Sequence, residues 1–319
     1  MRKVYYPHHV AEGVGFWSDE WSRVSLDQAL RGCEKDCRRP IFLQFLPRSG
    51  RILEAGCGPA YYVKYYRSLG YDMYGVDSDA SAIQKALTYD PHLPLCVADV
   101  SRLPFADGAF SAYYSGGVIE HAEDGPQEVL REAYRILRPD GLLVISVPVL
   151  NVKRSLEDLA VFSAGRRTWR KAKGAILGRI EVPYRYTQRH AYTIETPPDG
   201  HHFHLYVHSK AEVQRQLELA GFYPVFSRGI SIQWGLLDFP AVQRWHRRVT
   251  SSGNGEKSSG AAASALSAKR SWWRRAASPL VETLVKEDYS VWPAAPLLWC
   301  LHQWFSHSVL FICRKRSSG

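Results

Sequence analysis

Two glycines and a later carboxylate are spaced in this sequence as a binding site for a nucleoside would require. Residues 51–55 (RILEA) form a short apolar run that predicts a buried parallel strand. Gly56 and Gly58 break this run ahead of a helix predicted over residues 60–69, so backbone N–H groups and the positive end of a helix dipole approach a ligand. A second predicted strand, residues 72–76, ends at Asp77, whose carboxylate is placed to accept two hydrogen bonds from a ribose.

The residue at the last position of the glycine pattern argues against a dinucleotide ligand. A dinucleotide fingerprint, Gly-x-Gly-x-x-Gly, needs a third glycine for close packing of helix on strand, and Tyr61 stands there. Glu54 precedes the turn, where its carboxylate can meet a cationic group of the ligand. The pattern Glu-x-Gly-x-Gly resembles the first motif of class I S-adenosylmethionine (SAM) methyltransferases. The alternative interpretation of Gly56 and Gly58 is a turn that binds no ligand.

The downstream segments follow the order of the same family. Ser78 and Asp79 cap a helix predicted to run to about residue 88, and a third strand over residues 93–98 leads into Asp99 and Val100. The resemblance implies that Asp99 recognises the adenine amino group, although an acidic residue there can also cap a turn. It further implies contacts with the cofactor at Ser78, Val100 and Ser115.

The loop after the fourth predicted strand provides a candidate catalytic residue. Residues 103–110 (LPFADGAF) resemble the family's LPF-DG-FD segment, from which Ser111 departs because Asp is usual there. The strand over residues 109–115 opens into the loop 116–121, and ligands of open α/β sheets bind beyond the carboxyl ends of strands. His121 is therefore the candidate general base, with a hydrogen bond to backbone as its alternative role.

The resemblance covers residues 51–148, which look like the broad group of small-molecule methyltransferases related to the ubiquinone and menaquinone biosynthesis enzymes. It implies an α/β fold: a seven-stranded, mostly parallel sheet with helices on both faces and an antiparallel last strand. A helix over residues 128–137, stopped by Pro139 and Gly141, and a fifth strand over 141–147 fit this fold. The sixth strand is predicted to begin at Gly221, and residues 307–313 (HSVLFIC) are predicted to be the last.

The predicted domain organisation is an N-terminal helical cap, residues 1–48, followed by one methyltransferase domain, residues 49–319. Trp17 lies in an aromatic stretch of the cap that either closes over a ligand or packs in the core. The domain carries insertions at about residues 150–200 and 235–305. Within the second insertion, residues 250–268 are rich in Gly, Ser and Ala and predict a mobile loop.

A histidine cluster and a basic segment mark the second half. Alternation along a strand places His202 and His204 on one face, which predicts a part in the acceptor pocket. A zinc site lacks completing Cys or carboxylate spacing there, and it also lacks a second ligand pair near Cys33 and Cys37, so no metal is predicted. Residues 166–173 (RRTWRKAK) form either a solvated helix face or a surface for an anionic substrate.

The charge of the 319-residue chain is asymmetric. The net charge is +10, with 16 Lys/Arg and 19 Asp/Glu in residues 1–150 against 25 and 12 in residues 151–319. No secretory signal is visible near residues 1–10 and the six cysteines are scattered, which fits a reducing cytoplasm. Residues 291–313 carry no charged side chain, but their Pro, His, Gln and Ser content favours a helix and a strand over a membrane span. Peripheral contact with an anionic membrane surface stays open.

The expected function is transfer of a methyl group from SAM to a small-molecule or lipid- or glycan-linked acceptor. A nucleic-acid methyltransferase is the first alternative, favoured by the basic second half. It is disfavoured by residues 115–118 (SGGV), where enzymes acting on base amino groups carry Asn/Asp-Pro-Pro-aromatic. The second alternative is a SAM-binding protein without catalytic activity. The sequence does not predict the oligomeric state.

Overall fold

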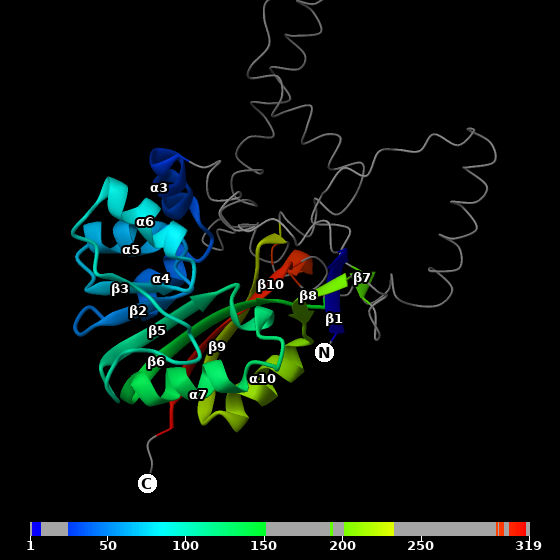
Figure 1. Cartoon of the computed structure of the whole chain (residues 1–319). Helices are drawn as coiled ribbons and strands as arrows, with labels where there is room; N and C mark the ends of the chain where they lie inside the picture. Colours follow the sequence, from blue (N-terminus) through cyan, green and yellow to red (C-terminus); the bar gives the residue numbers. More distant parts are fainter. Residues whose placement is uncertain are drawn as a thin grey trace, which may run out of the picture.

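A central sheet of seven strands organises the computed structural model of the protein (Figure 1). The structure describes residues 2–7, 25–150, 192–193, 201–232, 298, 300–302 and 306–316, the side chains of 2–7, 192–193 and 201–202 excepted. The strand order is β4-β3-β2-β5-β6-β10-β9. The strands are β2 (Ile52–Ala55), β3 (Met73–Asp77), β4 (Leu95–Val97), β5 (Phe110–Gly116), β6 (Leu137–Pro148), β9 (Phe222–Ile230) and β10 (Ser308–Lys315).

The direction of the strands confirms the predicted fold class. Strands β4, β3, β2, β5 and β6 pair in parallel, and β10 is antiparallel to both β6 and β9. Every residue of β2 is buried, as expected of a continuous apolar strand covered on both faces. The antiparallel strand β10, near the end of the chain, is the strand predicted over residues 307–313, and it lies between β6 and the edge strand β9.

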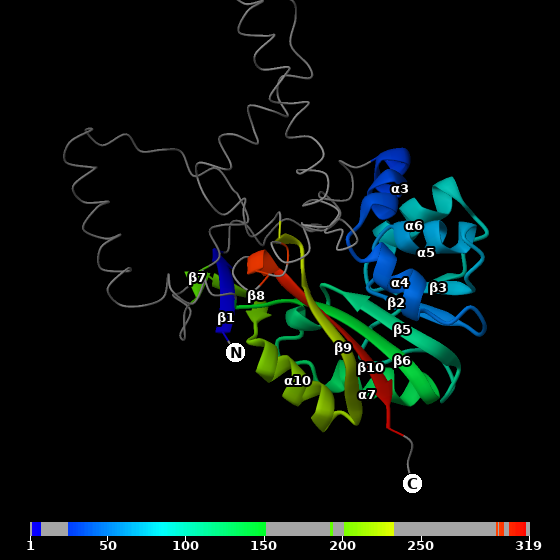
Figure 2. The same ribbon diagram turned by 180° about the vertical axis from the view of Figure 1, so that it is seen from behind.

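Helices cover both faces of the sheet (Figures 1 and 2). On one face, Phe42, Val63 and Ile83 anchor three helices in a hydrophobic core against the sheet. On the other face, Leu130 and Leu217 anchor two more in a second core. The helices of the first face are α4 (Arg39–Phe45), α5 (Tyr61–Ser68) and α6 (Ala80–Tyr89), with α3 (Leu26–Lys35) beside them; those of the second are α7 (Gln127–Ile136) and α10 (Lys210–Leu219).

Helix caps fix where several of these helices begin. The Asp79 carboxylate accepts hydrogen bonds from the backbone of Ser81 and Ala82 at the start of α6, as predicted. Ser209 and Glu212 form a reciprocal capping box at the start of α10. These polar residues therefore determine where α6 and α10 begin.

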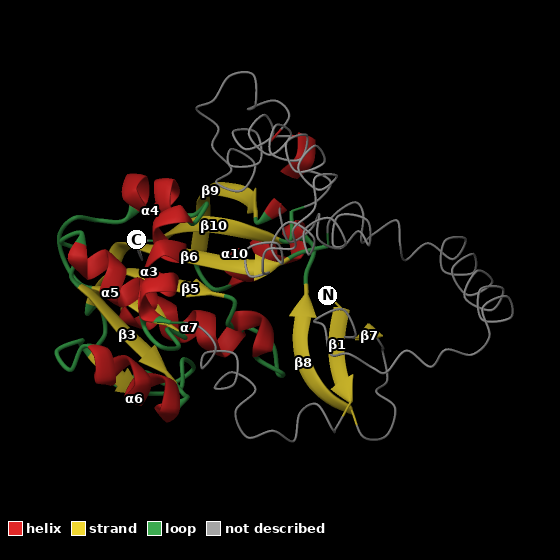
Figure 3. Cartoon of the chain, turned by 90° about the horizontal axis from the view of Figure 1, so that it is seen from above, coloured by secondary structure: helices red, strands yellow, loops and turns green. Residues whose placement is uncertain are grey.

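A second, three-stranded sheet was not predicted. Strand β1 (Arg2–Pro7) pairs antiparallel with β8 (His201–Val207) and with β7 (Tyr192–Thr193), and the three lie together beside the main sheet (Figure 3). The predicted cap, residues 1–48, therefore begins with a strand, and its described helices are confined to α3 and α4. The partner of β1 lies almost two hundred residues away in the chain, so local patterns could not reveal the pairing.

The junction between α7 and β6 also differs from the prediction. Helix α7 ends at Ile136, and β6 begins at once with Leu137, so Pro139 and Gly141 lie inside the strand. Asp140 between them adopts a left-handed φ of 59°. The helix ends one residue from its predicted end, ahead of Pro139, so only the start of the strand differs from the prediction.

Several predicted features lie outside the described residues. They include most of the insertion at 150–200 with the basic segment 166–173, the loop 250–268, and Trp17. Within the part of the chain that the structure describes, no helix is long and apolar enough to cross a membrane.

The close approach of β3 to α5 gives a stability prediction. A Cβ on Gly75 would lie 2.7 Å from Leu95 Cδ2, 2.9 Å from Cys57 Sγ and 2.9 Å from Val63 Cγ2. Gly75→Val should therefore lower the free energy of unfolding by about 1–3 kcal/mol, as overpacking does. The measurement is urea unfolding.

The matched control is Gly32→Ala in α3, where a Cβ meets nothing within 4 Å. There Ala should raise the free energy of unfolding by about 0.5–1 kcal/mol, because glycine is unfavourable inside a helix. A Gly75→Val protein as stable as the wild type would show that β3 does not pack as closely as described.

Candidate functional site

A glycine turn at the carboxyl end of β2 forms the floor of the candidate site. Gly56 and Gly58 adopt left-handed φ values of 77° and 50°, which favour glycine. A Cβ on Gly56 would lie 2.3 Å from Val118 Cγ2, so the turn lies directly against the loop that follows β5. The backbone N–H groups of Gly56 and Cys57 both donate to the Val76 carbonyl, at 2.8 and 2.9 Å, which ties the turn to β3.

Asp77 at the end of β3 faces this turn, as predicted. Its Oδ2 accepts a hydrogen bond from the Gly58 N–H at 2.7 Å, and its Oδ1 accepts one from the Asp79 N–H at 2.9 Å. A carboxylate has about four acceptor positions, so two bonds to backbone leave capacity for ribose hydroxyls. Asp77 therefore holds the turn in place and remains able to bind a ligand; Ser78 beside it is exposed.

Asp99 lies at the neighbouring strand end, in a tight turn. The N–H and the hydroxyl of Ser101 each donate to its Oδ1 at 2.8 Å, and these bonds hold the pKa of Asp99 below its usual value. The Ala98 N–H donates to the Asp77 carbonyl at 3.0 Å. This backbone hydrogen bond connects the segments that carry the two predicted cofactor carboxylates, Asp77 and Asp99. Asp99 thus caps a turn, the alternative role from the sequence, while Val100 packs partly buried against the core.

Glu54 is a buried carboxyl with an unsatisfied oxygen. It is 5% exposed, and its Oε2 has no hydrogen-bond partner among the described residues. Desolvation raises the pKa of Glu54 to about 8, against the opposing charge of Arg38. A cationic group in the site would supply the missing partner and stabilise the ionised form. Ser115 Oγ, at the end of β5, is likewise buried without a partner in the described ranges.

A polar cluster above the turn was missed by sequence reasoning. Arg38, at the start of α4, pairs with Asp36 through Nε and Nη2 at 2.8 and 2.7 Å. It also donates to the hydroxyls of Tyr62 on α5 and Tyr114 on β5, at 2.6 and 2.8 Å. Burial alone would raise the pKa of Asp36, but the charge and hydrogen bonds of Arg38 outweigh it and lower that pKa. The cluster fastens the helices before β2 to the edge that carries Glu54.

His121 lies in the short helix η1 (Ile119–His121) and faces the small sheet. Its Nδ1 lies 2.7 Å from the His204 carbonyl oxygen, and the two rings are 5.0 Å apart. A carbonyl only accepts, so Nδ1 carries the proton and Nε2 the lone pair of the neutral ring. Burial lowers the pKa of His121, and burial with His121 nearby lowers that of His204 to about 3.

The predicted acceptor pocket is assembled only in part by the described residues. His204 meets His121, whereas the side chain of His202 and the whole of Trp17 lie outside the described part. His208, at the end of the same histidine cluster, is 2% exposed and packs against the Tyr206 ring. The geometry of His121 agrees with both roles considered for it, a base and a backbone-bonded loop histidine.

Glu120 is a second buried carboxyl that the sequence did not single out. It is 2% exposed, its Oε2 has no partner among the described residues, and burial raises its pKa to about 8. Its only sequence signal is its place beside His121 in the loop after β5. Among the described side chains, no three His, Cys, Asp or Glu residues are grouped so that they could hold a metal ion.

Comparisons with known proteins agree with this geometry. Residues 53–145 match the model of a family described as "Methyltransferase domain". The malonyl-[acyl-carrier protein] O-methyltransferase of Enterobacter lignolyticus is 30% identical over 99 residues, covering 31% of this chain and 39% of that protein. A "Probable S-adenosylmethionine-dependent methyltransferase" of Mycobacterium tuberculosis is 32% identical over 130 residues, covering 40% and 44%. The chain thus spans less than half the length of these curated relatives.

One solved structure supports the fold. Phosphoethanolamine N-methyltransferase 2 of Haemonchus contortus, in complex with S-adenosyl-L-methionine, superposes with a TM-score of 0.50 at 14% identity, covering 96% of this chain and 61% of that one. The match to the family model spans β2 to β6, the strands that carry Glu54, Asp77 and the loop of His121. Residues 53–145 are therefore a methyltransferase domain, similar in sequence to domains of S-adenosylmethionine-dependent methyltransferases.

Proposed function

We propose that the protein transfers a methyl group from the sulfonium of SAM to a small-molecule or lipid- or glycan-linked acceptor. The observation that carries the proposal is the unsatisfied Oε2 of the buried Glu54 carboxyl, beside the glycine turn of a methyltransferase domain. A buried carboxyl with an unsatisfied oxygen is costly, and a ligand that brings a positive charge lowers that cost. SAM is such a ligand.

Residues at the carboxyl ends of the parallel strands each bind a different part of the cofactor in this proposal. Asp77 accepts from the ribose hydroxyls, Asp99 and Val100 border the adenine, and Glu54 faces the cationic end. Gly56 and Gly58 allow the backbone to approach, and Ser78 and Ser115 offer hydroxyls beside the same strand ends. When bound, SAM supplies an activated methyl group, so the protein mainly aligns donor and acceptor and excludes water.

His121 is the proposed general base for an acceptor that must lose a proton. A lone pair of the acceptor forms the new bond to the methyl carbon while the carbon–sulfur bond breaks and its electrons stay on sulfur. The acceptor proton goes to Nε2 of His121, the nitrogen left unprotonated by the bond from Nδ1 to His204. An acceptor that is already anionic, such as a carboxylate, needs no such base.

The class of acceptor rests on chemistry around the loop after β5. Residues 115–118 (SGGV) lack the Asn/Asp-Pro-Pro-aromatic pattern, which disfavours a nucleic-acid acceptor. A related enzyme is named for an acceptor attached to a carrier protein, malonyl-[acyl-carrier protein]. We therefore favour a small or carrier-linked acceptor in the cytoplasm, and we keep peripheral contact with an anionic membrane as a proposal for the basic second half.

The first functional prediction concerns cofactor choice and Asp77. Calorimetry should detect binding of SAM and S-adenosylhomocysteine and no appreciable binding of NAD. Asp77→Ala should weaken SAM binding about 10- to 150-fold, because hydrogen bonds to a charged group contribute about 1.5–3 kcal/mol. It also frees the Gly58 N–H that Asp77 now holds.

The control is Asp72→Ala, an exposed carboxylate just before β3, which should bind SAM as the wild type does. Unchanged affinity in a folded Asp77→Ala protein would contradict the ribose role. Tight NAD binding without a SAM signal would remove the assignment altogether. Release of labelled methyl groups onto a panel of acceptors then separates an enzyme from a SAM-binding protein without activity.

The second functional prediction concerns pH and Glu54. The pKa of Glu54 is about 8 in the folded protein against an ordinary 4.5, so the folded state holds a proton that the unfolded chain releases. The free energy of unfolding should therefore fall as pH rises from about 5 to 8. The Gln side chain in Glu54→Gln cannot ionise. Between pH 5 and pH 8 the free energy of unfolding of this variant should therefore fall by at least about 1.4 kcal/mol less than that of the wild type, the equivalent of one pKa unit.

Urea unfolding of both proteins without ligand at pH 5 and pH 8 measures the difference. The control is Glu123→Gln, an exposed carboxyl in the loop after η1, which should keep the wild-type pH dependence. If Glu54→Gln and the wild type decline equally, Glu54 is already ionised in the free protein and the cationic-site interpretation is wrong.

A further inference from the structure

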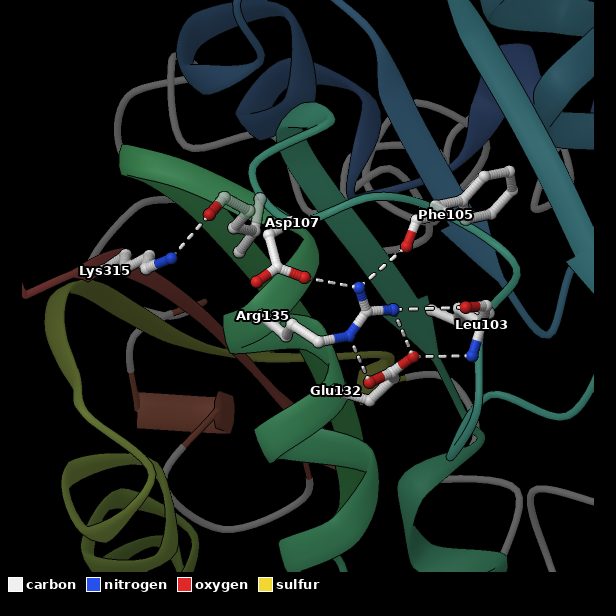
Figure 4. A network of polar contacts seen from close by, with 7 residues as sticks. Leu103, Phe105, Asp107, Glu132, Arg135 and Lys315 are labelled. Atoms are coloured by element: carbon white, nitrogen blue, oxygen red, sulfur yellow. Dashed lines mark hydrogen bonds and ion pairs between the residues drawn. The ribbon is translucent and has the colours of Figure 1, made fainter.

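An ion pair on α7 grips the loop that leads away from Asp99 (Figure 4). Glu132 and Arg135 stand one helical turn apart, and the guanidinium meets the carboxylate with two nitrogens, Nη2 to Oε1 at 2.7 Å and Nε to Oε2 at 2.8 Å. Such a two-point contact fixes the plane of both groups. Both side chains point away from the helix toward the loop (Figure 4).

The pair holds both backbone polar groups of one loop residue. The Leu103 N–H donates to Glu132 Oε1 at 2.6 Å, and Arg135 Nη2 donates to the Leu103 carbonyl at 3.1 Å. Arg135 Nη1 reaches further along the loop, to the Phe105 carbonyl and to Asp107 Oδ1, both at 2.7 Å. The loop is thus held by its backbone at Leu103 and Phe105, and the contact with the exposed Asp107 side chain adds little.

The contacts of Glu132 and Arg135 with the loop begin at Leu103, directly after the turn that contains Asp99. The turn is closed by the Arg102 N–H, which donates to the Asp99 carbonyl at 3.0 Å, and Leu103 is the next residue. On the upstream side, the Ala98 N–H donates to the Asp77 carbonyl. Asp99 therefore sits between two anchors, one on β3 and one on α7, in a stretch that the structure describes without helix or strand from residue 98 to residue 109.

We propose that Arg135, together with Glu132, is a positioning residue that holds Asp99 and Val100 in register for the adenosine end of the cofactor. The inference rests on the proposed binding of SAM along the edge of Asp77 and Asp99. Arg135 touches no reacting atom and acts through the Leu103 backbone. Removing it frees the downstream anchor while the buried Leu103 side chain still holds the loop to the core.

The test is Arg135→Gln, with SAM and 5′-deoxy-5′-methylthioadenosine measured separately by calorimetry at 20 °C. The second ligand keeps the adenosine end of SAM and lacks its amino acid end. We expect Arg135→Gln to weaken both ligands by the same factor, about 10-fold, because binding must then also order the loop that Arg135 no longer holds. Arg135→Lys keeps the positive charge but loses the two-nitrogen contact with Glu132. Its affinity for each ligand should lie between those of the wild type and Arg135→Gln.

Two control variants share the surroundings of Arg135. Asp107→Asn removes only the contact to an acid whose side chain is 82% exposed, where an ion pair contributes little. Arg131→Gln changes an exposed arginine one turn earlier on α7. Both should bind the two ligands within about 2-fold of the wild type, a difference of about 0.4 kcal/mol.

Melting temperatures separate positioning from a purely structural role. Well below its melting temperature nearly every molecule is folded, so a variant that is only less stable binds with the wild-type affinity. Arg135→Gln with a lower melting temperature and unchanged affinity for both ligands would overturn the inference. A larger loss for SAM than for the shortened ligand would also overturn it, since the amino acid end would then be affected. If Arg135→Gln does not fold, the same comparison is made with Arg135→Lys. A wild-type protein that binds neither ligand would instead refute the proposed function.

Discussion

The hydrogen bond from the Gly58 N–H to the Asp77 carboxylate is the contact on which the candidate site depends. It joins the turn after β2 to the end of β3 at 2.7 Å, and the Ala98 N–H extends the link to the end of β4. The turn can lie this close only because Gly56 has no side chain, since a Cβ there would meet Val118. Four strand ends are thereby brought to one edge, and that edge is where ligands of open α/β sheets bind.

The same edge carries an electrostatic cost in the ligand-free protein. Glu54 and Glu120 are both buried, and each has an oxygen that no described residue satisfies. Burial raises both pKa values to about 8, so near neutral pH these groups are held largely as uncharged acids. The hydroxyls of Tyr66, Tyr71 and Tyr113 in the core also lack partners, but Glu54 and Glu120 are the only carboxyls in this state among the described residues. Burying an ionisable carboxyl costs more than burying a hydroxyl, so these two glutamates are the stronger indication of function. The proposed cationic cofactor explains Glu54; Glu120 stands beside the proposed base without a contact that explains it.

The sequence predicted what local patterns encode. Continuous apolar runs identified the parallel strands, and Asp77, Asp79 and the glycine turn lie where spacing placed them. Contacts between distant segments escaped, because no local pattern specifies them. Arg38 meets Tyr114 across 76 residues, and β1 pairs with a strand near residue 205. The burial of Glu120 was equally hidden, since a glutamate in a loop is ordinarily exposed.

The proposed methyl-donor site and the proposed acceptor site differ in whether they lie inside the segment that matches the methyltransferase family. The family match ends at residue 145, inside β6, and contains the proposed cofactor residues from Glu54 to Ser115. The small sheet lies outside that match, yet its strand β8 meets the methyltransferase domain where the His204 carbonyl accepts from His121. That hydrogen bond selects the tautomer of the proposed base, so a segment outside the shared domain sets the base's protonation. Methyl donors are shared across a fold and acceptors are not. The acceptor of this protein should therefore be sought at the junction of η1 and β8.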